Sequence, residues 1–173
     1  RKKLWIVQTL SDGRCNGIRT VDGVPQVRLG DKLWNEYGHS GELVKLHFHD
    51  GSAGQAVDED LAAAFPDWTD CMRNTCYIVY EIDYDSNWFQ GLPQRTVELE
   101  GRLVWDYRTS EWVYSSNTAL VLYCYMTDES FPLEYPASHF DFDTWTAAAD
   151  YCDLKGYTWQ GSITPDMSPP DVI

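Results

Sequence analysis

Residues 76–84 read CYIVYEIDY, and this stretch decides the fold class. Its β-branched and aromatic residues favour extended backbone. Strict alternation places four apolar side chains on one face: Ile78, Tyr80, Ile82 and Tyr84. The segment therefore predicts a strand that turns this face toward an apolar core.

Similar short segments recur along the chain and predict further strands. They span residues 4–10, 19–29, 43–49, 97–105 and 112–114. Asp22-Gly23 supplies the positive φ values of a tight turn, so residues 19–29 are expected to form a hairpin. A return turn is expected near residues 109–110. Residues 118–126 are apolar at nearly every position, which favours a central strand buried on both faces.

Two segments predict short helices. In residues 58–65, Asp58 is a suitable N-cap, a run of alanines follows, and Pro66 ends the helix. In residues 143–152, Asp143 or Thr144 is the expected cap. The predicted fold is mainly β: a single-domain antiparallel β-sandwich, jelly roll or small barrel with one or two short helices in connections. Residues 1–163 form this domain, and residues 164–173 form an extended, Pro-rich tail.

The charge of the chain excludes several classes of partner. The 173 residues carry 27 acidic and 13 basic side chains, a formal net charge of −14. A field of this sign repels phosphate backbones and anionic lipid, so no nucleic-acid partner is expected. The apolar stretch 119–126 is too short to span a bilayer, and no membrane insertion is expected.

Five cysteines cannot all pair within one chain, and whether Cys71 and Cys76 pair stays open.

The strongest metal-like pattern is Gly41-x5-His47-x-His49. Two imidazoles at i and i+2 of a strand point to the same side and can share a metal. The spacing resembles the first half of the cupin metal motif, but the acidic residue and the later histidine of that motif have no counterpart. We therefore expect no metal and no other cofactor.

Glycan cleavage is the main enzymatic alternative. A small aromatic-rich jelly roll is also the build of family 11 xylanases, and residues 77–81 resemble strands of that family. A retaining glycosidase needs two carboxyl groups about 5 Å apart. Glu81, Glu98 and Glu100 are candidates, but the catalytic signatures of the family are missing. We therefore expect no catalytic residues and no enzymatic activity.

The remaining candidates are aromatic residues in expected loops, beside polar neighbours that can supply hydrogen bonds. Rings of this kind form protein contacts and stack on sugar rings. Trp88 is the best single candidate, because glycine at position 91 lets a ligand approach the backbone. The complete candidate ligand-binding set is Trp88, Phe89, Asp85, Asn87, Trp34, Tyr37 and Trp68.

An acidic β domain with unpaired thiols, loop aromatics, a basic N-terminus and a Pro-rich tail resembles a protruding (spike) domain. Such domains belong to capsid proteins of small non-enveloped RNA viruses, the astrovirus type among them. The resemblance implies a virion-surface location, attachment to a host receptor protein or glycan, a homodimer and no catalysis. Two alternatives remain: a secreted glycan-binding or glycan-cleaving β protein, and an acidic immunity or DNA-mimic protein.

Overall fold

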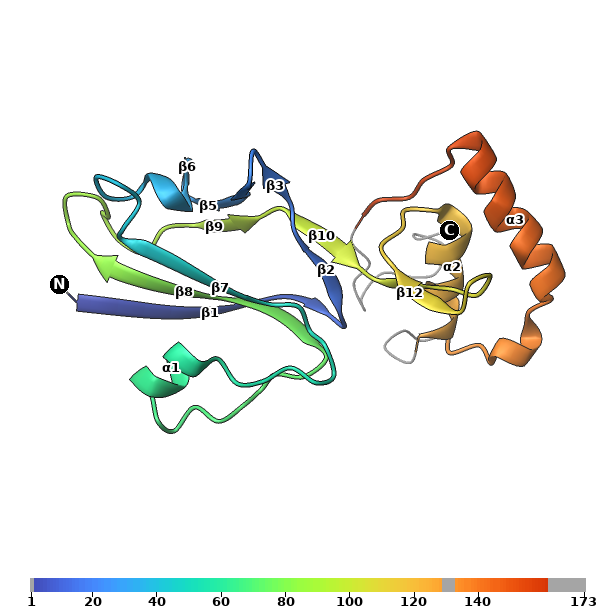
Figure 1. Ribbon diagram of the computed structural model, residues 1–173, viewed down its shortest axis with the longest axis horizontal. Helices are drawn as coiled ribbons and strands as arrows, with labels where there is room; N and C mark the ends of the chain where they lie inside the picture. The colour runs from blue at the N-terminus through green and yellow to red at the C-terminus, as the bar shows by residue number, and fades with distance from the viewer. Residues whose placement is uncertain (1, 129–132, 162–173) are drawn as a thin grey trace. The chain divides into compact units, whose positions relative to one another are not determined.

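The computed structural model describes residues 2–128 and 133–161 (Figure 1). It is mainly β, with 36% strand and 23% helix, and its sheets are antiparallel, which confirms the predicted fold class. The chain divides into two compact units, Arg1–Arg102 and Leu103–Ile173, called unit 1 and unit 2 below. Each unit has its own apolar core, whereas the sequence indicated a single core. The expected tail 164–173 lies outside the described residues.

Strand β8 (Thr75–Tyr84) is the centre of unit 1. It lies between β1 (Lys2–Asp12) and β7 (Val44–His49) and pairs antiparallel with both. Residues 76–82 are all buried, so both faces of this strand are covered. Ile78, Tyr80 and Ile82 share one face with the apolar residues of β7, as the alternation predicted.

The smaller strands of unit 1 form three further sheets. One contains β5 (Val27–Leu29) between β6 (Lys32–Leu33) and β9 (Arg95–Val97); the others pair β10 (Leu99–Arg102) with β2 (Cys15–Ile18), and β3 (Thr20–Val21) with β4 (Val24–Pro25). The turn between β3 and β4 has positive φ at Asp22 and Gly23, which confirms the predicted turn. A single 3-10 turn, η1 (Trp34–Glu36), follows β6.

The two faces of β8 pack into different cores. On one face, Ile78, Tyr80 and Ile82 pack with β5 residues such as Val27 and Leu29. This packing gives unit 1 its sandwich-like character. On the other face, Tyr77 and Val79 pack with Leu61 of α1 (Glu59–Ala64). Helix α1 and its loop thus cover the second face of the sheet (Figure 1).

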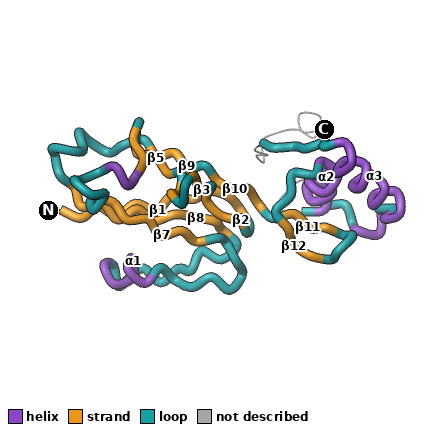
Figure 2. Tube along the Cα trace, turned by 45° about the horizontal axis from the view of Figure 1, so that its top comes forward, coloured by secondary structure: helices purple, strands orange, loops and turns teal. Residues whose placement is uncertain are grey.

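Unit 2 is a β-hairpin packed with two helices, and the longer helices of the chain belong to it (Figure 2). Its elements are β11 (Val104–Asp106), β12 (Glu111–Val113), α2 (Thr118–Thr127), η2 (Ala137–His139) and α3 (Phe142–Lys155). The predicted helix 143–152 and the turn near residue 110 are confirmed. The cap of α3 is Asp141, not Asp143 or Thr144.

The predicted central strand 118–126 is wrong, because these residues form α2. An apolar run of this length has no periodicity that separates a buried strand from a buried helix. The deciding residue is Asn117, whose side chain accepts hydrogen bonds from the Ala119 and Leu120 backbone N–H groups. It satisfies two otherwise unpaired donors at the helix start.

The predicted continuous strand 97–105 is also corrected. It is divided into β9, β10 and β11, and each part pairs with a different strand: β5, β2 and β12. The alternation of side chains continues through the breaks, so periodicity alone could not reveal them.

Arg108 joins the hairpin of unit 2 to α3. Its guanidinium donates to both oxygens of Asp106, at 3.0 and 2.8 Å, and to Asp150 and Asp153 at 2.8 Å each. Asp153 also accepts a 2.6 Å bond from Asn117, the cap of α2. One side chain therefore links the hairpin directly to α3 and, through Asp153, to the start of α2.

We expect Arg108→Ala to lower the free energy of unfolding by about 2 kcal/mol, because the substitution leaves the buried carboxylate of Asp106 without its charged partner. Chemical denaturation followed by circular dichroism measures this change. Arg19→Ala is the matched control, since Arg19 and Glu98 form an exposed pair and such pairs contribute about 0–1 kcal/mol. Equal effects of the two substitutions would contradict the assignment.

The same network predicts loss of stability in acid. Hydrogen bonding to Arg108 lowers the pKa of Asp106, and Arg108 and Asn117 lower the pKa of Asp153. A carboxylate with a depressed folded-state pKa stabilises the fold fully above its unfolded pKa, about 3.9, and loses this contribution as pH falls through the folded value. The melting temperature should therefore drop below about pH 4. Arg108→Ala should show a shallower drop than the unmodified chain.

Candidate functional site

A polar cluster lies on the face of the central sheet that α1 covers. His47 and His49 are two residues apart on β7 and lie opposite Val79 and Tyr77 of β8, so both point to this face. Asp58, the N-cap of α1, accepts a 2.7 Å bond from the Leu61 backbone N–H. Its Oδ2 lies 3.0 Å from His47 Nδ1 and 2.8 Å from His49 Nε2. Both imidazoles thus converge on one carboxylate.

Asp58 is 3% exposed, so its charge depends on these partners. Burial alone would raise the pKa of Asp58, but hydrogen bonds from His49, the Leu61 N–H and His47 hold the pKa below its ordinary value. The side chain therefore stays ionised and can only accept hydrogen bonds at neutral pH. It ties the start of α1 to β7.

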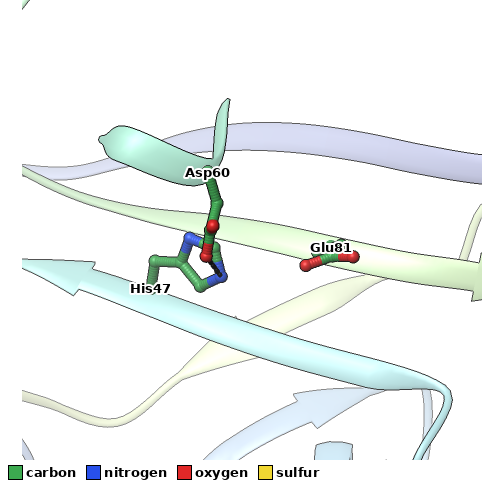
Figure 3. Close-up of side chains that lie close together, drawn as sticks. All are labelled: His47, Asp60 and Glu81. Atoms are coloured by element: carbon green, nitrogen blue, oxygen red, sulfur yellow. Dashed lines mark ion pairs between the residues drawn. The ribbon is translucent and has the colours of Figure 1, made fainter. Parts of the chain in front are cut away.

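Two further carboxylates approach His47 from other elements (Figure 3). Asp60 of α1 places its Oδ2 3.6 Å from His47 Nε2. Glu81 of β8 is 4% exposed, and it contacts Lys3 and, at 3.2 Å, Lys45. One ligand atom from each of His47, Asp60 and Glu81 lies within 4.8 Å of the other two.

Lys3 and Lys45 stabilise the negative charge of Glu81. Burial would raise the pKa of Glu81, but hydrogen bonds from Lys3 and Lys45 bring the pKa below its ordinary value. An ionised carboxylate on the buried face of the sheet is consistent with these contacts, because an unpaired charge there would be costly. The cluster is therefore a network of ionised and hydrogen-bonded groups.

The sequence located the histidine pair but missed its partners. The two rings share Asp58, a role that the sequence did not suggest beyond helix capping. The sequence pattern does not distinguish Asp60, and it indicates Glu81 only as a candidate glycosidase carboxylate. The pairing of β7 with β8 explains part of this proximity. Lys45 lies opposite Glu81, and His47 lies opposite Val79. Glu81 is therefore a diagonal neighbour of His47.

The three candidate glycosidase carboxylates have separate partners. Glu81 binds lysines, Glu98 pairs with Arg19 at 3.2 Å, and Glu100 accepts a 2.5 Å bond from Asn16. Among the described residues, each of the three therefore has its own hydrogen-bonding partners.

The predicted loop aromatics contribute mainly to packing. Phe89 stacks on Tyr37 with ring centroids 4.7 Å apart, and both rings are buried in the core beside β8. Tyr37 also donates its hydroxyl to the Leu29 carbonyl. These two residues therefore turn their rings into unit 1.

The three tryptophans of the predicted set are half-buried and do not form one patch. Trp34 and Trp88 pack against the core on one face of β8, whereas Trp68 packs against the core on the other face. Lys32 Nζ lies 5.3 Å from the Trp88 ring centroid, and His39 meets that ring edge-on at 6.1 Å. Trp88 thus has part of its indole enclosed by side chains of the same unit.

The polar members of the predicted set close the turn before Trp88. The side chain of Asp85 accepts a 2.9 Å bond from the Asn87 backbone N–H, and its carbonyl accepts from the Trp88 and Phe89 N–H groups. Asn87 is exposed. The Asp85 carboxylate therefore shapes the loop that holds Phe89 in the core.

The sequence missed a group of exposed apolar side chains at the end of α3. Tyr151, Leu154 and Tyr157 are 51%, 78% and 54% exposed. Tyr151 and Leu154 are three positions apart on α3, so they lie on the same side of the helix. Tyr157 follows the Gly156 cap, and its ring lies 6.0 Å from that of Tyr151. We call these three residues the α3 cluster.

Comparison with protein-family models finds no matching family, and a search of curated proteins finds no significant match. Within the described residues, no helix is both long and apolar enough to cross a membrane.

We expect Phe89→Ala to lower the free energy of unfolding by about 3–5 kcal/mol, because it empties a ring-sized volume beside Tyr37. Urea denaturation of the full chain measures this. Tyr151→Ala, which truncates a half-exposed ring, should change the free energy of unfolding by less than about 1 kcal/mol. A small effect at Phe89 would mean that this ring is not part of the core.

Proposed function

We propose that the chain is a non-enzymatic recognition domain that binds a protein partner through the α3 cluster of unit 2. The observation that carries this proposal is the distribution of exposed large apolar residues. Among the described residues, three belong to unit 1 and seven to unit 2, although unit 2 is the shorter of the two. The seven are Trp112, Tyr114, Tyr135, Phe142, Tyr151, Leu154 and Tyr157.

The composition of the α3 cluster favours a protein over a sugar. Tyrosine rings offer broad contact area at low entropic cost and are enriched at protein interfaces. Leu154 has no hydrogen-bonding group, and its exposed aliphatic side chain needs an apolar pocket. A sugar ring would leave this side chain in water, whereas a protein partner can bury it.

The charge of unit 2 supports a basic partner. Residues 103–173 contain eleven acidic residues and two basic ones, a formal net charge of −9. Arg108 is already bound to three carboxylates, and Lys155 lies over the ring of Tyr151 at 5.7 Å. A partner with arginine and lysine around an apolar centre complements this surface.

The wider setting that we propose is a viral surface protein, in which this domain binds a host receptor protein. This setting is supported by the acidic, aromatic-rich and mainly β character of the chain. Its location would then be the virion surface.

A peptide array tests the proposed function. We expect bound peptides to be rich in Arg, Lys and apolar residues, and binding to weaken as salt rises. Leu154→Asp combined with Tyr151→Ala should weaken the best peptides by more than about 20-fold, as removal of a central apolar anchor does. Val21→Asp with Leu92→Ala, two exposed apolar residues of unit 1, is the matched control.

Binding that is equal in both double variants would contradict the assignment to the α3 cluster. Binding to a glycan array, with no peptide bound, would instead favour the glycan alternative.

A further inference from the structure

We propose that His47, Asp60 and Glu81 form a binding site for a divalent transition-metal ion. The three residues come from β7, α1 and β8, and one ligand atom of each lies within 4.8 Å of the others (Figure 3). This site lies in unit 1, and it is independent of the recognition surface proposed for unit 2.

The hydrogen bonds of His47 fix which ring nitrogen is available. The Asp58 carboxylate lies 3.0 Å from His47 Nδ1. With Nδ1 turned toward Asp58, the other ring nitrogen, Nε2, lies on the side of Asp60, where it can bind a metal ion. A carboxylate that holds the far nitrogen of a metal-binding histidine is the usual outer partner in protein metal sites.

The free nitrogen then faces other acceptors. His47 Nε2 lies 3.6 Å from Asp60 Oδ2, and the Glu81 carboxylate completes the group. Two carboxylates that converge with a ring nitrogen favour a cation between them, and Glu81 already binds the ammonium groups of Lys3 and Lys45. A divalent metal ion would supply further positive charge between His47, Asp60 and Glu81.

The ligand types indicate which metal fits. One imidazole nitrogen and two carboxylate oxygens suit Zn²⁺ and neighbouring first-row ions, whereas Mg²⁺ and Ca²⁺ prefer oxygen alone. Zinc bonds of about 2.0–2.2 Å require the ligands to lie closer than 4.8 Å. The exposed Asp60 side chain can move to close this distance. Three protein ligands leave a fourth position for water.

Lys3 and Lys45 compete with the metal for Glu81. Their side chains are 52% and 65% exposed, so either ammonium group can move into solvent when a metal ion takes its place beside the buried Glu81 carboxylate. Their positive charges oppose metal binding while they remain near. Removal of one lysine should therefore strengthen metal binding, a direction that a site without metal would not show.

The test is titration of the purified chain with Co²⁺, followed by visible absorption, and with Zn²⁺ against a chromophoric chelator. We expect one saturable site per chain. His47→Ala and Asp60→Asn should each weaken binding at least 10-fold, and Asp58→Asn about 10-fold through loss of ring orientation. Lys45→Ala should strengthen binding about threefold or more.

His39→Ala is the matched control, because His39 contacts Trp88 rather than this cluster, and it should leave the affinity unchanged. Circular dichroism of each variant separates loss of binding from loss of fold, and the exposed Asp60 provides a variant that leaves the core intact. No saturable binding, or binding that His47→Ala and Asp60→Asn leave unchanged, would overturn the proposal. A weaker affinity in Lys45→Ala would also contradict it.

Discussion

Burial of β8 on both faces is the constraint on which unit 1 depends. Every residue from 76 to 82 is buried, so this strand needs a partner layer on each side. The sheet of β5, β6 and β9 contributes apolar residues on one side, and α1 with its loop does so on the other. The strand pairs at both edges as well, which leaves its backbone groups satisfied. The local architecture follows from the need to enclose this strand.

The second face of β8 is not wholly apolar, and this exception creates the polar cluster. Glu81 follows Tyr77 and Val79 on that face and lies at 4% exposure. A buried carboxylate requires charged or hydrogen-bonding partners, and Lys3 and Lys45 come from the two strands that flank it. Asp58 meets the same requirement with two histidines and a helix cap. Packing and electrostatics are therefore coupled at this face.

The sequence predicted the elements whose signal is local. Alternation indicated β7 and β8, and a capping aspartate followed by alanines indicated α1. It failed at α2, because a run that is apolar all round has no periodicity and its state is decided by the Asn117 cap and by tertiary packing. The polar cluster consists of residues from different elements, and their spacing along the sequence does not show that they lie close together in the fold. The loop aromatics looked accessible because a loop position says nothing about the direction of its ring, and Phe89 turns inward.

The charge distribution explains why the two units differ in what they expose. Unit 1 satisfies its buried acids internally, through lysines and histidines placed by its sheet. Unit 2 has two basic residues for eleven acidic ones, and Arg108 is committed to three carboxylates that hold the hairpin to α3. Acidic residues therefore outnumber basic ones by nine in this unit. Its exposed tyrosines and Leu154 add apolar area to the same acidic unit. A basic partner with an apolar centre would match both the negative charge and the exposed apolar side chains of unit 2. Such a partner would supply positive charge and bury the exposed rings at the same time.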